Sequence, residues 1–341
     1  MSSEATAMLY KDVPKADLLT IDFARLFDKD PEEVAKLVHA CERDGFFYID
    51  LQNPSATNFW ADLCSVDEIT REWFALPQEV KLRTPTVSLA HGFKAVGNQS
   101  GAIESRRDGF EALKIGKHEL AGRWALAPVV REHLALFDHV TASCHFISKL
   151  LLDCLSDGLG LRGGERLETH HRDDCRSKST LYMLHYPQQQ QQDRGTTSDP
   201  QQVGQNMHTD IGTLTILWAP QWGLQAFAPG RAAWEYVEPR EGRIVVNVGD
   251  TLRFLSGRRF KSALHRVLPV GEGGVQREDR YSISYFLRAN DSAEFEDSNG
   301  DGSDAKSWYL QKYQMYEMPH EIQKQRTVLS GGMAQELKAS F

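Results

Sequence analysis

The chain has 341 residues, of which 41% are hydrophobic and 25% are charged, as in an ordinary folded globular protein. Its formal net charge of −8 argues against nucleic acid as a partner, because binding to a phosphate backbone needs a basic surface. The five cysteines form no Cys-x-x-Cys pair, and no stretch resembles a signal peptide or a membrane span, which favours reduced thiols, a cytoplasmic location and no membrane partner.

The N-terminal part of the chain is predicted to be rich in helices. After a short strand at residues 19–23, Asp30 and Pro31 provide the capping side chain and the first-turn proline of a helix N-terminus. This helix should end at Gly45, before an apolar strand at residues 46–49. The other predicted helices cover residues 58–74, a short segment after Pro77, and residues 128–157, where apolar side chains recur on one face.

From residue 179 onward the sequence changes to short β-prone segments that are separated by turns. The predicted strands cover residues 179–186, 214–218, 224–227, 234–237, 244–248, 251–255 and 281–287. Gly249-Asp250 is predicted as a tight turn between two of them. Many short strands at regular spacing are typical of a sandwich or barrel. We therefore expect an α+β fold with a mainly β core, a double-stranded β-helix (jelly roll) braced by N-terminal helices and a C-terminal helix.

Three regions are expected within one compact unit. Residues 1–125 form a helix-rich N-terminal region, residues 126–290 form the β-helix domain with its long bracing helix, and residues 291–341 form an acidic loop and a C-terminal helix. Residues 188–205 are rich in glutamine and have too little apolar surface to pack, so we expect a loop there. Residues 291–304 are acidic and rich in glycine, which predicts a second loop before an aromatic-faced helix.

The pattern His208-Thr209-Asp210 points most directly to chemistry. In an extended chain, residues i and i+2 project to one face, so His208 and Asp210 can reach a single metal ion while Thr209 points away. His265, within another strand-like segment, can supply a third ligand. Two neutral imidazoles and one carboxylate on one face of an octahedral ion leave three positions open, as in non-haem iron oxygenases, whereas zinc prefers a tetrahedral site.

A second copy of the His-x-Asp pattern, His171-Arg172-Asp173, shows that this pattern alone is a weak signal. The second copy lies in a charged segment that no β-prone run follows. We interpret it as solvent-exposed surface and not as a metal site.

Arg280-Tyr281-Ser282 is a further pair of alternating polar side chains, on a predicted strand that follows His265. Both Arg280 and Ser282 should face the same cavity, where a guanidinium and a hydroxyl can hold a carboxylate through charge-assisted hydrogen bonds. A diacid co-substrate fits this pair. Taken alone, Arg280 would be interpreted as forming a surface ion pair with an acid such as Asp279.

The order of these motifs resembles the isopenicillin-N-synthase-like branch of the iron(II)/2-oxoglutarate dioxygenases. Residues 181–187 are similar to the family's strand ending in Asn-Tyr-Tyr-Pro, and residues 246–250 resemble its Val-Asn-x-Gly-Asp turn. Segments of the family's N-terminal region are matched by residues 21–23, 43–47 and 74–77, so the likeness runs from about residue 19 to residue 290. Leu184 and His185 depart from the family pattern, which leaves Tyr186 as the candidate contact to the oxo-acid end of the co-substrate.

This resemblance implies a cofactor and two co-substrates. Fe(II) would be bound by His208, Asp210 and His265. 2-Oxoglutarate would be held by Arg280, Ser282 and Tyr186. Together with O2, and with ascorbate as an optional reductant, 2-oxoglutarate would be decarboxylated to succinate and carbon dioxide. That reaction would be coupled to oxidation, by default hydroxylation, of a small organic metabolite in specialised metabolism.

Two alternatives remain open at this stage. An iron oxidase of the same fold could close a ring or desaturate its substrate without 2-oxoglutarate, and a metal-free sandwich could serve only as a binding protein. A small-molecule substrate is expected in preference to a protein or a nucleic acid, because the segments that line and cover the cavity in the family, here residues 91–111 and the C-terminal helix, are rich in apolar and aromatic residues. No pattern indicates an oligomeric state.

Overall fold

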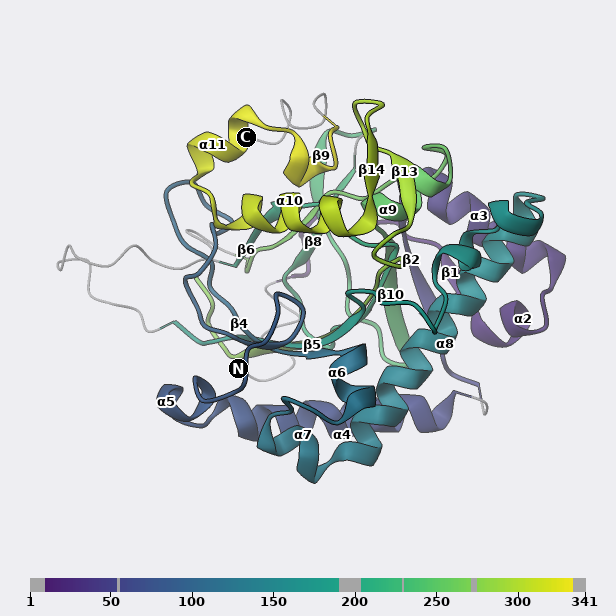
Figure 1. The fold of residues 1–341 in the computed structure, drawn as a ribbon. Helices are drawn as coiled ribbons and strands as arrows, with labels where there is room; N and C mark the ends of the chain where they lie inside the picture. Colours follow the sequence, from purple (N-terminus) through teal and green to yellow (C-terminus); the bar gives the residue numbers. More distant parts are fainter. Residues whose placement is uncertain (1–9, 54–55, 190–203, 229, 271–274, 334–341) are drawn as a thin grey trace.

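Two β-sheets face each other in the computed structural model, which describes residues 10–53, 56–189, 204–228, 230–270 and 275–333 (Figure 1). Side chains of both sheets line a cavity. The larger sheet has the strand order β1 (Thr20–Asp22), β2 (Phe46–Asp50), β10 (Arg243–Val248), β7 (Leu214–Trp218), β12 (Arg280–Leu287), β5 (Thr180–Tyr186), β4 (Glu111–Gly116) and β3 (Gly92–Lys94). The smaller sheet has the order β6 (Gln205–His208), β11 (His265–Val267), β8 (Leu224–Ala228) and β9 (Ala233–Tyr236). The expected α+β fold with a jelly-roll core is confirmed.

Helices cover the outer face of the larger sheet and one end of the two sheets. Their bounds are α2 (Phe23–Phe27), α3 (Pro31–Arg43), α4 (Thr57–Phe74), α5 (Gln78–Lys81), α6 (Lys117–Gly122), α7 (Pro128–Glu132), α8 (Leu134–Gly158), α9 (Asp250–Leu255), α10 (Ala305–Glu317) and α11 (His320–Gln325). The predicted cap of α3 is confirmed, because the Asp30 side chain accepts hydrogen bonds from the backbone N–H groups of Glu32 and Glu33. Within the described parts of the chain, no helix combines the length and the apolar character needed to cross a membrane.

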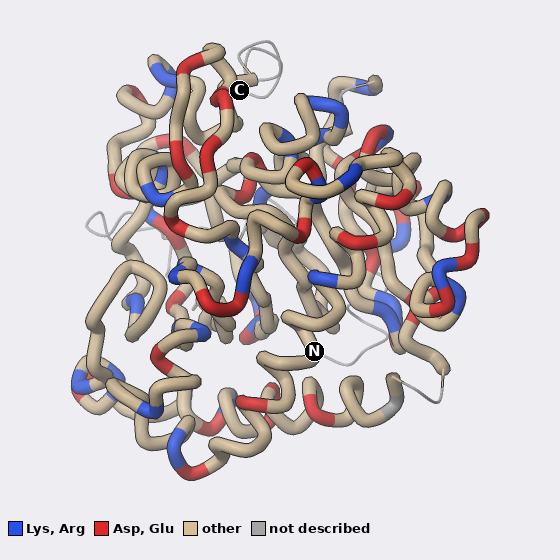
Figure 2. The backbone as a smooth tube through the Cα atoms, turned by 45° about the vertical axis from the view of Figure 1, so that its right-hand side comes forward, with Lys and Arg blue, Asp and Glu red and all other residues tan. Residues whose placement is uncertain are grey.

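Charged residues of both signs are interspersed along the described backbone (Figure 2). Many of them form ion pairs with one another. Arg166, for example, pairs with Asp153 and Asp157 of α8 and with Glu168 nearby in the chain. Pairs near the surface contribute about 0–1 kcal/mol each, so the stability of the fold depends mainly on its apolar core.

Side chains of β12 alternate between two environments. Ile283, Tyr285 and Leu287 belong to the main hydrophobic core, which also contains side chains of α3, α4 and α8. The residues between them, such as Ser282 and Ser284, line the cavity between the sheets. Because successive side chains of a strand point to opposite faces, the apolar row fixes the register of β12 and thereby directs the polar row inward.

The prediction of a strand at residues 251–255 is wrong, because this segment belongs to the helix α9. Thr251, Leu252 and Phe254 are all buried, and this close spacing of buried positions suits one face of a short helix and not a half-buried strand. The β-prone residue types of the segment were therefore misleading. The tight turn predicted at Gly249-Asp250 is wrong as well, since Gly249 is the N-cap of α9.

The start of α9 holds the chain segment between β6 and β7. The backbone N–H groups of Asp250 and Thr251 donate to the carbonyl oxygens of Asp210 and Gly212, at 2.8 and 2.9 Å. A Cβ atom on Gly249 would lie only 2.3 Å from the Gly212 carbonyl oxygen, so this close approach of two backbones requires glycine.

Three further predictions need correction. The helix predicted at residues 128–157 is divided into α7 and α8, which meet at His133. The predicted loop at residues 291–304 contains a small hairpin of β13 (Glu294–Glu296) and β14 (Gly302–Asp304). In the glutamine-rich segment, Gln205 begins β6, whereas residues 190–203 lie outside the described residues.

His171 is buried, which contradicts the predicted surface position of this residue. Its Nδ1 lies 3.0 Å from the Leu167 carbonyl oxygen and its Nε2 lies 2.7 Å from the Thr213 hydroxyl oxygen. Burial lowers the pKa of His171 to about 3, so the ring is neutral and both nitrogens are satisfied within the fold. The second His-x-Asp copy thus has a structural histidine.

The C-terminal helix α10 lies across one end of the two sheets and is tied to them by a buried charge (Figure 1). Lys312 is fully buried, donates to the Thr209 hydroxyl at 2.5 Å and forms an ion pair with Asp250. Asp250 also accepts hydrogen bonds from the Ser262 hydroxyl and from the Trp308 indole. The charged pair is therefore surrounded by partners, and it connects α10 to the residue between His208 and Asp210.

We predict that Lys312→Met lowers the free energy of unfolding by about 3–5 kcal/mol, because it leaves Asp250 as an uncompensated buried charge. Urea unfolding followed by circular dichroism measures this change. Lys306→Met, at an exposed position of the same helix, is the matched control and should change stability by about 0.5 kcal/mol or less. A loss of less than about 1 kcal/mol in Lys312→Met would contradict the proposed role of the buried pair.

Candidate active site

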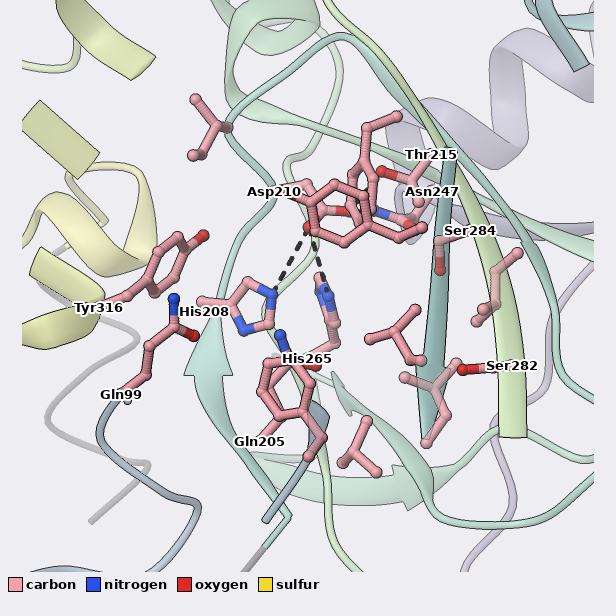
Figure 3. A pocket seen from close by; sticks show the side chains of 18 of the residues that line it. Gln99, Gln205, His208, Asp210, Thr215, Asn247, His265, Ser282, Ser284 and Tyr316 are labelled. Atoms are coloured by element: carbon pink, nitrogen blue, oxygen red, sulfur yellow. Dashed lines mark hydrogen bonds and ion pairs between the residues drawn. The ribbon is translucent and has the colours of Figure 1, made fainter. Parts of the chain in front are cut away.

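Three side chains of metal-ligand type converge where β6 and β11 lie side by side (Figure 3). His208 is the last residue of β6 and pairs with His265, the first residue of β11, in antiparallel register. Asp210 follows two residues after His208, and its Oδ1 lies 3.5 Å from His208 Nε2 and 3.7 Å from His265 Nε2. Their three ligand atoms lie within 4.8 Å of one another, and among the described residues this is the only such group of three.

Both imidazoles are oriented by the backbone. Nδ1 of His208 lies 2.8 Å from the Asn206 carbonyl oxygen, and Nδ1 of His265 lies 3.0 Å from the Ala263 carbonyl oxygen. A carbonyl oxygen can only accept, so each Nδ1 carries the proton and each Nε2 presents a lone pair to the space between the rings. Burial lowers the pKa of His265 to about 4, which keeps this ring neutral, as metal binding requires.

The two oxygens of the Asp210 carboxylate have different neighbours. Its Oδ2 accepts hydrogen bonds from the Thr215 hydroxyl at 2.5 Å and from the Asn247 amide at 2.7 Å, which leaves Oδ1 directed at the imidazoles. Burial alone would raise the pKa of Asp210, but the two histidines and Asn247 together lower it well below its usual value. The carboxylate is therefore ionised, and the donor set of two imidazoles and one carboxylate fits Fe(II).

Arg280 lies at one end of the same cavity, as predicted, and is only 2% exposed. Its Nε donates to the Trp222 carbonyl oxygen at 2.8 Å, its Cζ lies 4.9 Å from the ring centre of Tyr186, and its Nη1 has no hydrogen-bond partner among the described residues. Burial lowers the pKa of Arg280, because no acid among the described residues compensates the charge. A buried guanidinium in this state fits an anionic ligand.

The alternative of a surface ion pair between Arg280 and Asp279 is wrong. Asp279 accepts a hydrogen bond from the backbone N–H of Gln188 and lies 3.1 Å from Nε2 of His185. His185 faces the outer side of β5, opposite to its neighbour Tyr186, whose hydroxyl donates to Gln205 within the cavity. The departure of His185 from the family pattern thus affects the side of the strand that faces away from the cavity.

Ser282 lines the cavity next to Arg280, and the strand pairing places it opposite Leu184. In Figure 3, Ser282 and Ser284 lie on the opposite side of the cavity from His208 and its neighbour Tyr316. The Tyr316 ring packs edge-on against His208, with ring centres 5.4 Å apart. Side chains of both sheets and of α10 therefore surround the group of ligands.

Several cavity residues were not identified from the sequence as site residues. Asn247 had a signal, since it belongs to the Val-Asn-x-Gly-Asp resemblance, but its bond to Asp210 could not be foreseen. The segment from His91 to Glu111 was expected to line the cavity, and it does so through Lys94, Gln99 and Phe110. Lys94 forms a buried ion pair with Asp108 at 2.8 Å. Tyr313 and Tyr316 of α10 also line the cavity, whereas Arg288 carried no sequence signal.

Comparisons with known proteins agree with this geometry. A family model described as the 2OG-Fe(II) oxygenase superfamily matches residues 177–289, and one described as the N-terminal part of a non-haem dioxygenase in morphine synthesis matches residues 18–128. The chain is 67% identical to the 2-oxoglutarate-dependent dioxygenase FG08081 of Gibberella zeae over the full length of both proteins. It is 40% identical to the 2-oxoglutarate-dependent dioxygenase frbH of Dothideomycetidae sp., over 95% of this chain and 98% of that one.

The fold is also that of a solved protein that binds the same co-substrate. A Neurospora crassa protein whose crystal structure was determined in complex with alpha-KG superposes with a TM-score of 0.70 at 24% identity, covering 87% of this chain and 97% of that one. The expected enzyme class is confirmed, with Fe(II) as cofactor and with 2-oxoglutarate and O2 as co-substrates. The chain belongs to the family of iron(II)- and 2-oxoglutarate-dependent dioxygenases.

Proposed function

We propose that this dioxygenase hydroxylates a small organic metabolite of specialised metabolism, with Fe(II) held by His208, Asp210 and His265. The observation that carries this proposal is the convergence of three ligand atoms on one side of a cavity whose far end holds the uncompensated guanidinium of Arg280. Metal ligands and an anion site in one enclosed space suit a metal-bound diacid.

Arg280, Ser282 and Tyr186 are proposed to hold the co-substrate. Arg280 and Ser282 occupy alternate positions of β12 and face the cavity together, so a guanidinium and a hydroxyl are available to the distal carboxylate of 2-oxoglutarate. Tyr186 pairs with Arg280 across β5 and β12, and its ring covers the guanidinium. We therefore propose that Tyr186 lies beside the distal carboxylate, and not at the oxo-acid end as the resemblance implied. When bound, Fe(II) and 2-oxoglutarate supply the oxidation, in which O2 is consumed and succinate and carbon dioxide are formed.

The protein contributes orientation and exclusion of water. The backbone carbonyls behind the two histidines, and the side chains behind Asp210, hold the three ligands in one arrangement before any metal binds. The apolar side chains of Phe46, Leu184, Leu217 and Phe286 form much of the remaining cavity wall. A substrate enclosed by these residues is a small molecule, shielded from bulk water while it is oxidised.

The two alternative functions are not favoured. An oxidase that works without 2-oxoglutarate is less well supported, because Arg280 is buried with no carboxylate partner among the described residues and the similar proteins are named as 2-oxoglutarate-dependent enzymes. A metal-free binding protein does not account for three ligand atoms that face one another with their other polar atoms already engaged.

We predict that the anaerobically loaded wild-type protein contains equimolar iron and that His208→Ala loses it. Removal of one of three protein ligands breaks the facial arrangement on which metal affinity depends. Elemental analysis after desalting measures the iron content. His139→Ala, on the exposed surface of α8, is the matched control and should retain iron. Full iron occupancy in His208→Ala would contradict the assignment of this ligand.

Arg280→Ala should weaken 2-oxoglutarate binding by roughly 2–5 kcal/mol, the range for removing one member of a buried charge pair. Anaerobic titration of the iron-loaded protein with 2-oxoglutarate measures the affinity. Arg243→Ala, which removes an arginine of the same sheet that pairs with Asp50 away from the cavity, should leave the affinity unchanged. An unaltered affinity in Arg280→Ala would show that the distal carboxylate binds elsewhere.

A further inference from the structure

A second buried arginine lies at the other end of the cavity-facing row of β12. Arg288 directly follows the strand and lines the same cavity as Arg280, with Ser282, Ser284 and Phe286 between them. Eight residues of extended chain, at about 3.3 Å each, separate the two Cα atoms by about 26 Å. A five-carbon diacid that is anchored on Arg280 is too short to reach Arg288, so the cavity has two separate cationic ends.

The charge of Arg288 has no acidic partner among the described residues. Its Nη1 donates to the Lys178 carbonyl oxygen, but its Nε has no hydrogen-bond partner in the described parts of the chain, although the residue is only 7% exposed. The rings of Phe286 and Tyr309 lie 5.1 and 5.0 Å from its Cζ, and the Tyr309 hydroxyl is likewise buried without a partner. An unpaired buried guanidinium is costly unless a ligand supplies the negative charge.

Lys114 adds a second positive charge to this end of the fold. Its Nζ lies 3.0 Å from the Leu89 carbonyl oxygen and 3.4 Å from the Tyr313 hydroxyl, and its neighbours are the rings of Tyr182 and Tyr313. Burial, followed by the positive charges of Lys94 and Arg288, lowers the pKa of Lys114 to about 8. Tyr182 and Tyr313 themselves line the cavity, so this end combines excess positive charge with aromatic walls.

We propose that the substrate of this enzyme is an organic acid whose carboxylate binds Arg288, at the end of the cavity remote from Arg280. This inference rests on the proposed function, because it assigns 2-oxoglutarate to the Arg280 end. A planar guanidinium with an unpaired Nε–H suits a carboxylate, and the rings of Tyr182, Phe286 and Tyr313 suit the apolar body of the acid. Arg288 would thus select substrates by charge and hold them between the cationic end and the metal ligands.

A purely structural role for Arg288 makes a different prediction. If the guanidinium only bound the Lys178 carbonyl and packed on Tyr309, the cavity would show no preference between a carboxylic acid and its uncharged amide. The charge of the ligand therefore separates the two roles, without requiring knowledge of the natural substrate.

The test uses the full chain, loaded anaerobically with Fe(II) and saturating 2-oxoglutarate so that the Arg280 end is occupied. Benzoate, cinnamate and octanoate are compared with benzamide, cinnamamide and octanamide by isothermal titration calorimetry. We expect at least one of the acids to bind more tightly than its amide by about tenfold or more. Arg288→Met should weaken binding of that acid by about 30-fold or more, the lower end of the effect of removing one member of a buried charge pair.

Two controls make the result specific. Arg288→Lys keeps the positive charge and should retain part of the preference for the acid, and Lys306→Met, on the exposed face of α10, should retain all of it. Arg288→Met should bind 2-oxoglutarate as the wild-type protein does. If Arg288→Met does not fold, the wild-type comparison and Arg288→Lys still decide the question.

The proposal is overturned if the wild-type protein binds none of the acids, binds acids and amides equally, or keeps its preference in Arg288→Met. Failure of the proposed function would appear differently, as an unchanged affinity of Arg280→Ala for 2-oxoglutarate. The two readouts use different ligands and different arginines, so one can fail while the other holds.

Discussion

The alternation of side chains along β12 is the constraint on which the site depends. The strand is covered by helices on one side and by the smaller sheet on the other, so both of its rows of side chains are enclosed. The outer row, with Ile283, Tyr285 and Leu287, is apolar and packs in the core. The inner row begins with Arg280 and ends with Arg288, and both charges are buried. Packing of the outer row therefore places the inner row inside the molecule. Its two buried guanidinium groups are stable there only when a ligand provides negative charge.

The three candidate metal ligands, His208, Asp210 and His265, are oriented by hydrogen bonds that involve no metal. Each imidazole has its Nδ1 bound to a carbonyl oxygen two residues earlier in the chain, and Asp210 has one oxygen engaged by Thr215 and Asn247. Contacts from other segments fix the chain between His208 and Asp210. Lys312 donates a hydrogen bond to the Thr209 hydroxyl, and the N-terminal end of α9 donates to the Asp210 carbonyl oxygen. Because these supports come from distant segments, the site forms only when α10 and both sheets are in place.

The sequence predicted that His208, Asp210 and His265 converge and that Arg280 faces the same cavity, because both predictions rest on local spacing. A two-residue period in a strand is visible without a structure, and the order of the motifs carried the family resemblance. Other features depend on contacts between distant segments. Buried His171 has the hydroxyl of Thr213 as a partner, and buried Lys312 has the carboxylate of Asp250. In both pairs the two residues are far apart in the sequence. Arg288 lies outside the Arg280-Tyr281-Ser282 pattern, and its position in the cavity became evident only from the structure of the whole inner row.

The decisive measurement is a crystal structure of the enzyme prepared without oxygen, with Fe(II) and 2-oxoglutarate bound. We expect one iron ion bonded to Nε2 of His208, Oδ1 of Asp210 and Nε2 of His265, with the distal carboxylate of 2-oxoglutarate on Arg280. Iron bound by other side chains, or a 2-oxoglutarate carboxylate on Arg288 in place of Arg280, would contradict this expectation.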